Sequence, residues 1–174
     1  MRNALLLDWD AARVDAVFDQ ALAGYQRHYL AINGNYSTLF DGVTEGLQAM
    51  REQGLRLVCV TNKPIAFTLP LLDQKGLAPY FERVFGGDSF AKKKPDPMPL
   101  LGACAALDLS PTQVVAIGDS SNDAEAARAA GCFVLTVPYG YNHGRPIQEI
   151  NSDGIVGSLL EAAELITAHN RTAT

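Results

Sequence analysis

From Leu55 onward, apolar runs of strand length alternate with helical segments, and no other feature of this sequence limits its fold as strongly. Strands are predicted at 55–60, 83–85, 114–117, 133–137 and 154–156, and helices at 67–74, 97–107, 122–130 and 159–168. Alternating buried strands and helices are typical of a parallel sheet with helices on both faces, because each crossover helix packs back onto the sheet. The predicted fold class is therefore α/β, with three layers.

The segment before this alternation is predicted to be helical. Its apolar residues recur at spacings of three and four, which indicates one amphipathic helix of about five turns: Val14, Phe18, Leu22, Tyr25, Tyr29 and Ile32. The run Asn33-Gly34-Asn35 ends that helix, and residues 36–42 link it to a second helix at 43–53. We therefore expect three parts, which are a helical segment at 1–35, an α/β core at 36–168 and a flexible tail at 169–174.

Charge and hydropathy exclude two classes of partner. The formal net charge of -5 offers no basic footprint for nucleic acid. No apolar run approaches the ~20 residues of a membrane span, and the apolar stretch at 4–7 is too short for a signal peptide. We expect a cytoplasmic protein that binds neither nucleic acid nor membrane, in which local positive groups would hold any anionic substrate.

Three polar motifs follow predicted strands, and ligands of open α/β sheets bind beyond the carboxyl ends of the strands. The motifs are Val60-Thr61-Asn62-Lys63-Pro64, Lys94-Pro95-Asp96-Pro97 and Gly118-Asp119-Ser120-Ser121-Asn122-Asp123. Together they supply a hydroxyl, an ammonium and a pair of carboxylates. That set suits the binding of a phosphate beside a divalent cation.

Each motif also has a simpler interpretation. Asp119 on its own is compatible with a helix cap. Two carboxylates four residues apart at a strand end are costly without a cation, so Asp119 and Asp123 favour a Mg²⁺ site, which needs only one or two carboxylates. Thr61 on its own fits a helix cap equally well. Lys94 differs from an ordinary solvated lysine because two prolines stiffen the backbone after it.

The order of the three motifs resembles that of the haloacid dehalogenase-like superfamily of phosphohydrolases, and within it the phosphoglycolate phosphatases. The resemblance covers roughly residues 36–165 and implies a Rossmann-like core. It also implies that Thr61 and Lys94 are catalytic, with Thr61, Asn62 and Lys94 binding the phosphoryl group. Asp119 would ligate Mg²⁺ directly, and Asp123 would support the ion or its waters.

The beginning of the chain departs from this family pattern. The family begins with a strand that ends in Asp-x-Asp-Gly-Thr, whose first Asp attacks phosphorus and whose second is the general acid and base. Here Asp8-Trp9-Asp10 follows an apolar run, but Ala11-Ala12 replaces Gly-Thr. Too few residues separate this run from Thr61 to hold the family's helical cap. Residues 1–32 are therefore interpreted as the tail of such a cap, with Asp8 and Asp10 as a degenerate nucleophile motif the alternative.

Two classes of function remain open on these grounds. The first is a Mg²⁺-dependent phosphomonoesterase that acts through an aspartyl-phosphate, with this chain truncated and weakly active or inactive alone. The second is a non-catalytic remnant that binds phosphate or a partner protein. A receiver domain is a weaker third possibility, because it also uses acidic residues, a Thr and a Lys-Pro pair but has no need of a Gly-Asp motif after its lysine.

Overall fold

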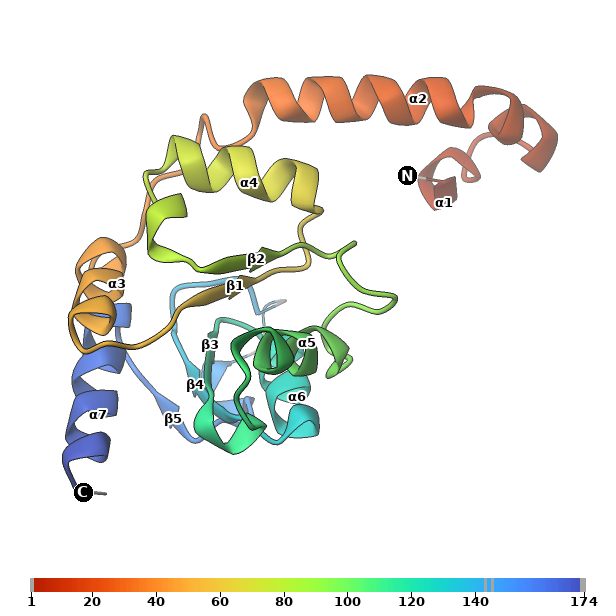
Figure 1. Cartoon of the computed structure of the whole chain (residues 1–174). Helices are drawn as coiled ribbons and strands as arrows, with labels where there is room; N and C mark the ends of the chain where they lie inside the picture. Colours follow the sequence, from red (N-terminus) through yellow and green to blue (C-terminus); the bar gives the residue numbers. More distant parts are fainter. Residues whose placement is uncertain (1, 143, 145, 173–174) are drawn as a thin grey trace. The chain divides into compact units, whose positions relative to one another are not determined.

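The computed structural model describes residues 2–142, 144 and 146–172 and divides into two compact units, Met1–Thr38 and Leu39–Thr174 (Figure 1). The described part of the first unit consists of helix α1 (Arg2–Leu5) and the long helix α2 (Ala11–Ile32). The predicted long helix is confirmed, and it begins earlier than its apolar pattern suggested. Asp10 caps it, since its carboxylate accepts the Arg13 N–H at 2.9 Å.

No described residue of the first unit lies in a strand. The apolar run that precedes Asp8 forms helix α1 and a turn, and Asp10 serves as a helix cap. In the alternative interpretation, this run forms a strand that ends in a nucleophilic aspartate. The structure has a helix and a turn there and no strand. That the segment is the tail of a cap stays a prediction.

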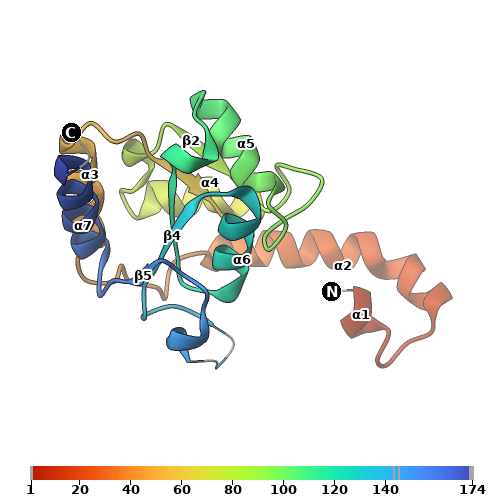
Figure 2. The same ribbon diagram turned by 90° about the horizontal axis from the view of Figure 1, so that it is seen from below.

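The described residues of the second unit form five strands, paired in parallel within two sheets. Strands β1 (Val58–Val60) and β2 (Arg83–Phe85) pair with each other. Strand β4 (Phe133–Thr136) lies between β3 (Val115–Gly118) and β5 (Gly154–Ile155). Figure 2 shows β4 beside β5. All five strands lie within their predicted ranges or one residue outside them. The first is shorter than predicted, because residues 55–57 are not in the strand.

In the part of this unit that the structure describes, the strands are surrounded by five α-helices, which are α3 (Val43–Glu52), α4 (Ile65–Gln74), α5 (Met98–Leu107), α6 (Ser121–Ala130) and α7 (Leu159–Thr172). Three short 3₁₀ helices, η1 (Ala78–Tyr80), η2 (Pro111–Gln113) and η3 (Ile147–Glu149), were not expected from the sequence. Helix α7 extends past its predicted end into the residues expected to form a flexible tail. Residues 173 and 174 of that tail lie outside the described residues.

Two apolar clusters show that the sheet is covered on both faces. One joins Leu100 and Cys104 of α5, four alanines of α6 and Val134 of β4. The other joins Met50 of α3, Leu135 of β4 and two alanines of α7, and α3 lies alongside α7 in both views (Figures 1 and 2). Neighbouring residues of β4 thus enter opposite clusters, as the two-residue period of a strand requires. The prediction of a three-layer α/β fold is confirmed.

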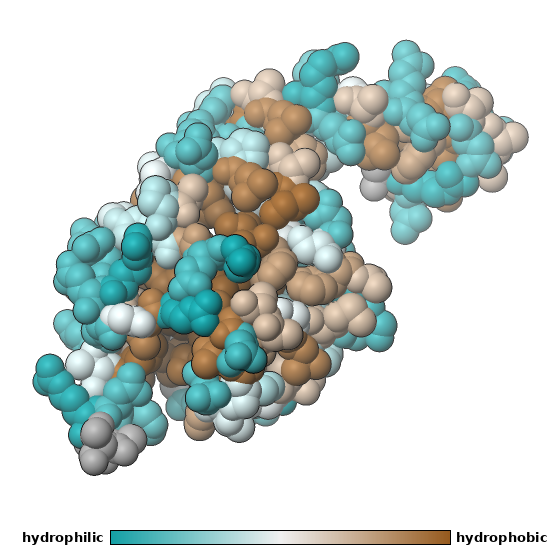
Figure 3. Space-filling view, viewed as in Figure 1, coloured by the Kyte–Doolittle hydropathy of each residue, from teal (hydrophilic) through white to brown (hydrophobic). Residues whose placement is uncertain are grey.

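The edges of β1 and β3 that face away from β2 and β4 have no strand partner among the described residues. Apolar side chains also reach the surface of this unit, including Val115 of β3 and Phe133 of β4, and Figure 3 shows apolar surface on the face in view. Along the described chain, no helix combines the length and the apolar character that crossing a membrane would demand.

Candidate active site

A largely buried lysine links the end of β1 to the first turn of α6, the helix that follows β3. The Lys94 ammonium donates to the Val60 carbonyl at the end of β1 and to Asp123 Oδ1 in the first turn of α6, both at 2.6 Å. Only 12% of the Lys94 side chain and 14% of the Asp123 side chain are exposed. An ion pair so far removed from water fixes its two partners closely, because neither charge can be left alone there at low cost.

The loop after β1 lies against the same lysine. The Asn62 side chain donates to the Lys94 carbonyl at 2.8 Å, and the Thr61 hydroxyl accepts the Lys63 N–H at 3.2 Å. Gly87 makes this packing possible, because a Cβ there would lie 2.2 Å from the Asn62 carbonyl oxygen. The loop that holds the predicted phosphate-binding residues therefore packs against both Lys94 and Gly87.

Asp123 uses both of its carboxylate oxygens within the protein. While Oδ1 accepts from Lys94, Oδ2 accepts the Ser120 hydroxyl at 2.5 Å and two backbone N–H groups, those of Asp119 and Ser120. Burial by itself would raise the pKa of Asp123, but the Lys94 ammonium and the Ser120 hydroxyl outweigh it and hold that pKa below its ordinary value. Asp123 is therefore an ionised anchor for the lysine and for the turn that starts α6.

Asp119 has a different environment. Its Oδ2 accepts the Tyr141 N–H at 3.0 Å, and no hydrogen bond joins its Oδ1 to the described part of the chain. Burial raises the pKa of Asp119, and the neighbouring Asp123 adds to the effect, whereas the Tyr141 N–H opposes it. A half-buried carboxylate beside a second carboxylate is the kind of group that a cation stabilises.

The oxygen ligands available at Asp119 match the requirements of Mg²⁺ only in part. Mg²⁺ keeps several waters and binds through one or two carboxylates, and Asp119 offers one oxygen for that purpose. Asp123 offers none while it is paired with Lys94. Within the described ranges there is no group of three or more His, Cys, Asp or Glu side chains arranged to hold a metal ion.

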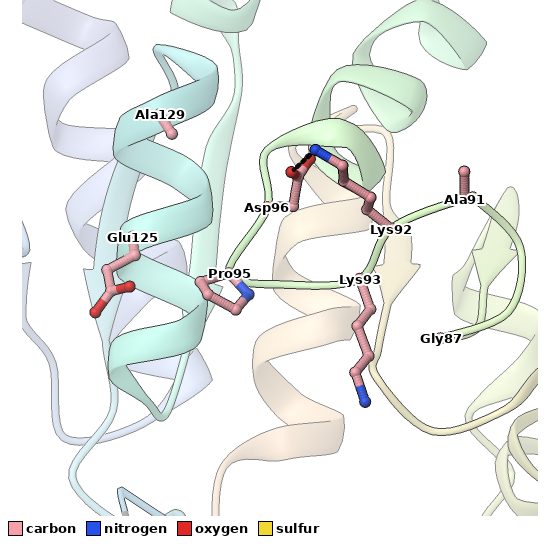
Figure 4. Close-up of a pocket in the computed structure, with 8 residues that line it drawn as sticks. All are labelled: Gly87, Ala91, Lys92, Lys93, Pro95, Asp96, Glu125 and Ala129. Atoms are coloured by element: carbon pink, nitrogen blue, oxygen red, sulfur yellow. Dashed lines mark hydrogen bonds and ion pairs between the residues drawn. The ribbon is translucent and has the colours of Figure 1, made fainter.

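An open groove of about 780 Å³ lies beside this cluster but does not contain it (Figure 4). Lys92 and Asp96 form an ion pair at 2.9 Å on one wall, and Glu125 of α6 stands on the other. Lys94, Thr61 and Asp119 are not among its lining residues. The groove is consequently not the site that the motifs predict.

The structure therefore brings Asn62, Lys94, Asp119 and Asp123 into one network, with Thr61 beside the carbonyl that Lys94 contacts. The sequence motifs did not reveal the groups that hold this network in place, which include the Ser120 hydroxyl and the Tyr141 N–H. Ser120 stands inside a motif and could have been proposed as a capping residue. A backbone N–H has no signature in a sequence.

Comparison with known proteins places this arrangement in a family. Residues 1–131 match the model of a haloacid dehalogenase-like hydrolase. A phosphoglycolate phosphatase of Thiobacillus denitrificans is 50% identical over 167 residues, 96% of this chain and 74% of the relative. A phosphoglycolate phosphatase of Nitrosospira multiformis is 48% identical over 95% of this chain and 73% of the relative.

Solved structures agree with these relatives. The crystal structure of a predicted phosphoglycolate phosphatase from Haemophilus somnus 129PT superposes with a TM-score of 0.78 at 35% identity. That match covers 82% of this chain and 63% of the other, so the chain spans less than two thirds of that protein. The structure of CbbY from Rhodobacter sphaeroides in complex with phosphate gives a TM-score of 0.69 at 25% identity, over 78% of this chain and 61% of the other.

Proposed function

This chain belongs to the haloacid dehalogenase-like hydrolase family, and on that premise we propose that it is a Mg²⁺-dependent phosphomonoester hydrolase of the phosphoglycolate phosphatase type. Its substrate is a small phosphorylated metabolite, with 2-phosphoglycolate the first to test, as the names of its relatives suggest. The observation that carries the proposal is the contact of one largely buried ammonium with both the end of β1 and the first turn of α6.

In this proposal each residue has a role that follows from its chemistry. The Thr61 hydroxyl and the backbone N–H groups after it bind the phosphoryl oxygens, with Asn62 beside them. Lys94 neutralises the charge that gathers on those oxygens as the phosphoryl group transfers, an electrostatic contribution that is large where water is excluded. Asp123 keeps Lys94 in place through their ion pair at 2.6 Å.

Mg²⁺ is the cofactor in this proposal, held directly by Asp119 and indirectly supported by Asp123. When bound, the ion supplies a positive charge next to the phosphate. Asp119 suits the role because it is half-buried, because its pKa is raised by burial and because one of its oxygens is available. Asp123 contributes by orienting the backbone of Asp119, whose N–H it accepts at 3.3 Å.

The nucleophile is the part that these residues do not supply. Covalent transfer through an aspartyl-phosphate needs a free carboxylate within bonding reach of phosphorus. Asp119 is committed to the cation and Asp123 to Lys94, while Asp10 caps α2. We propose that the 174 residues alone are weakly active or inactive, and that a strand ending in Asp-x-Asp-Gly-Thr completes the site.

The test measures phosphate release from 2-phosphoglycolate with Mg²⁺ by two proteins, the 174-residue chain and a version extended at its N-terminus by that strand. We expect turnover at background for the first and at least 100-fold above it for the second. Lys94→Ala in the extended version should lower kcat about 100-fold or more. Lys75, a partly exposed lysine directly after α4, provides the matched control, since Lys75→Ala should leave kcat unchanged.

Three outcomes contradict the proposal. If Lys94→Ala leaves the activity of the extended version unchanged, the ammonium of Lys94 does not have the role assigned to it. Mg²⁺-dependent turnover by the 174-residue chain that disappears with Asp8→Asn would make Asp8 the nucleophile instead. The non-catalytic alternative predicts that both proteins bind phosphate and neither hydrolyses an ester.

A further inference from the structure

We propose that the segment Tyr139–Asn142 is a positioning element for Asp119, in which the Tyr141 backbone N–H orients the carboxylate and Gly140 provides the space for it. The inference rests on the proposed function in one respect, namely that Asp119 is the residue that holds the cation. The run Tyr139-Gly140-Tyr141-Asn142 contributes to the resemblance to the phosphoglycolate phosphatases, but that resemblance assigns none of the four residues a role in the site.

The hydrogen bond defines which oxygen of Asp119 faces the segment. Tyr141 N–H donates to Oδ2 at 3.0 Å, from a position 22 residues further along the chain. The side chain of Tyr141 is not the donor, and it is 73% exposed. With Oδ2 held in this way, the other oxygen, Oδ1, is the one that can accept a new ligand.

Gly140 is needed for space and not for backbone conformation. A Cβ on Gly140 would lie 2.0 Å from Asp119 Oδ2 and 2.3 Å from Cγ, far closer than non-bonded atoms can approach. The φ angle of Gly140 is not in the positive region, unlike that of Gly131 or Gly144. Alanine could therefore adopt this backbone, and its only effect would be to displace the carboxylate or the segment.

The segment is itself tied to the elements that carry the site. Just before it, the Val137 N–H donates to the Gly118 carbonyl at 2.9 Å, which extends the pairing of β3 and β4 to their carboxyl ends. At its other end Asn142 Oδ1 accepts the Ser121 N–H at 3.1 Å, in the first turn of α6. The Tyr139 ring packs on Phe40 with centroids 4.5 Å apart.

This arrangement pre-orients a ligand that would otherwise rotate. An aspartate at a strand end has two torsions and, when it makes no contact, samples several positions for its oxygens. Metal affinity depends on such outer contacts, and losing one typically weakens binding 10- to 100-fold. We therefore expect the Tyr141 N–H to be worth about tenfold in affinity for a divalent cation.

The experiment uses the full chain and Mn²⁺, a paramagnetic divalent cation whose binding is followed by electron paramagnetic resonance. Tyr141→Pro removes the N–H, whereas Tyr141→Ala keeps it and removes only the exposed ring. We expect the Kd for Mn²⁺ to rise about tenfold in Tyr141→Pro and in Gly140→Ala, and to stay within twofold in Tyr141→Ala. Gly24→Ala, where a Cβ would meet nothing within 4 Å, is the glycine control.

A second measurement tests the contact without any metal. In ¹⁵N-labelled protein, the amide proton of Tyr141 should move upfield in Asp119→Ala, because it loses its carboxylate acceptor, and thermal unfolding should show that the variants remain folded. An unmoved Tyr141 resonance, or equal Mn²⁺ affinity in Tyr141→Pro and Tyr141→Ala, overturns the inference. If the parent chain and Asp119→Asn bind Mn²⁺ equally, the metal site of the proposed function is refuted instead. The amide resonance of Tyr141 would then still show whether its N–H contacts Asp119.

Discussion

At the scale of single residues, the ion pair of Lys94 and Asp123 is the contact on which the site depends. Both side chains are nearly buried, and each has further hydrogen bonds to the protein. Such a pair contributes little net stability compared with apolar side chains of the same size, but removing one partner leaves the other charged and buried. Its value lies in fixing where the ammonium points.

Lys94→Met should therefore destabilise the fold by about 3 kcal/mol at pH 7, because Asp123 keeps its charge without its partner. The double variant Lys94→Met with Asp123→Asn should recover part of the loss, since no buried charge then remains. Urea unfolding of the four proteins in this cycle measures the coupling energy. Additive losses in the double variant would show that the two side chains do not stabilise each other.

Asp153 is a second residue whose negative charge stabilises the fold. Its carboxylate accepts the Val134 N–H at 2.8 Å and pairs with Arg128 of α6 at 2.7 Å, and these two contacts, the backbone N–H first, lower its pKa. A carboxyl whose pKa is lower in the folded state stabilises the fold above its unfolded pKa, about 3.9. That contribution is lost as the pH falls through the lower folded value.

Asp153→Asn should accordingly cost about 1 kcal/mol at pH 7, a modest figure because a third of the side chain is exposed and water screens the pair. The difference between parent and variant should shrink below about pH 4 and vanish once Asp153 is protonated in the folded parent. Urea unfolding at pH 7, 5 and 3 follows it. A difference that stays constant over this range would mean that the charge is not responsible.

At the scale of elements, the packing of α3 on α7 depends on a glycine. Gly46 is buried, and a Cβ there would lie 2.3 Å from the backbone of Leu159 at the start of α7. Glycine within a helix normally lowers its stability by about 1 kcal/mol relative to alanine. Its presence in α3 is explained by the close approach of the two helix backbones, which no larger residue permits.

Gly46→Ala should destabilise the protein by about 2 kcal/mol despite the better helix propensity of alanine, because the two helices must move apart. The measurement is the midpoint of urea unfolding monitored by far-ultraviolet circular dichroism. Gly24→Ala in α2 serves as the matched control, since it has open space and should give no loss. Equal midpoints for the two variants would show that the interface adapts without strain.

At the scale of the whole molecule, the chain consists of two units whose boundary follows Thr38. The segment around this boundary is accessible to proteases, since Tyr36 is 92% exposed and residues 37–40 have no regular secondary structure. Exposed segments outside helices and strands are the preferred sites of proteolysis.

Brief digestion with chymotrypsin should therefore cut first after Tyr36 and leave a fragment that begins at Ser37, identified by mass spectrometry. Tyr36→Ser should remove this first cut. Tyr141 is also exposed, but its backbone is held by Asp119, so it should be cut later. Cleavage after Tyr141 before Tyr36 would contradict both this order and the proposed positioning contact.

Much of the fold was predictable from the sequence. The alternation of apolar strands with helices determines a layered α/β fold, because strands buried on both faces must be apolar throughout and crossover helices must have one apolar side. The same reasoning placed Thr61 and Asp119 at strand ends, where ligands of such sheets bind. These are local properties, which depend on residues that are neighbours along the chain.

Tertiary structure decided which groups meet. Lys94 and Asp123 are 29 residues apart, and nothing in either motif specifies that one ammonium contacts both Asp123 and the Val60 carbonyl. The Tyr141 N–H that orients Asp119 belongs to the backbone, which every residue but proline carries. Whether two distant groups meet depends on how the layers pack. The sequence thus determined which side chains are present at the strand ends, and only the packing of the whole chain decided their partners.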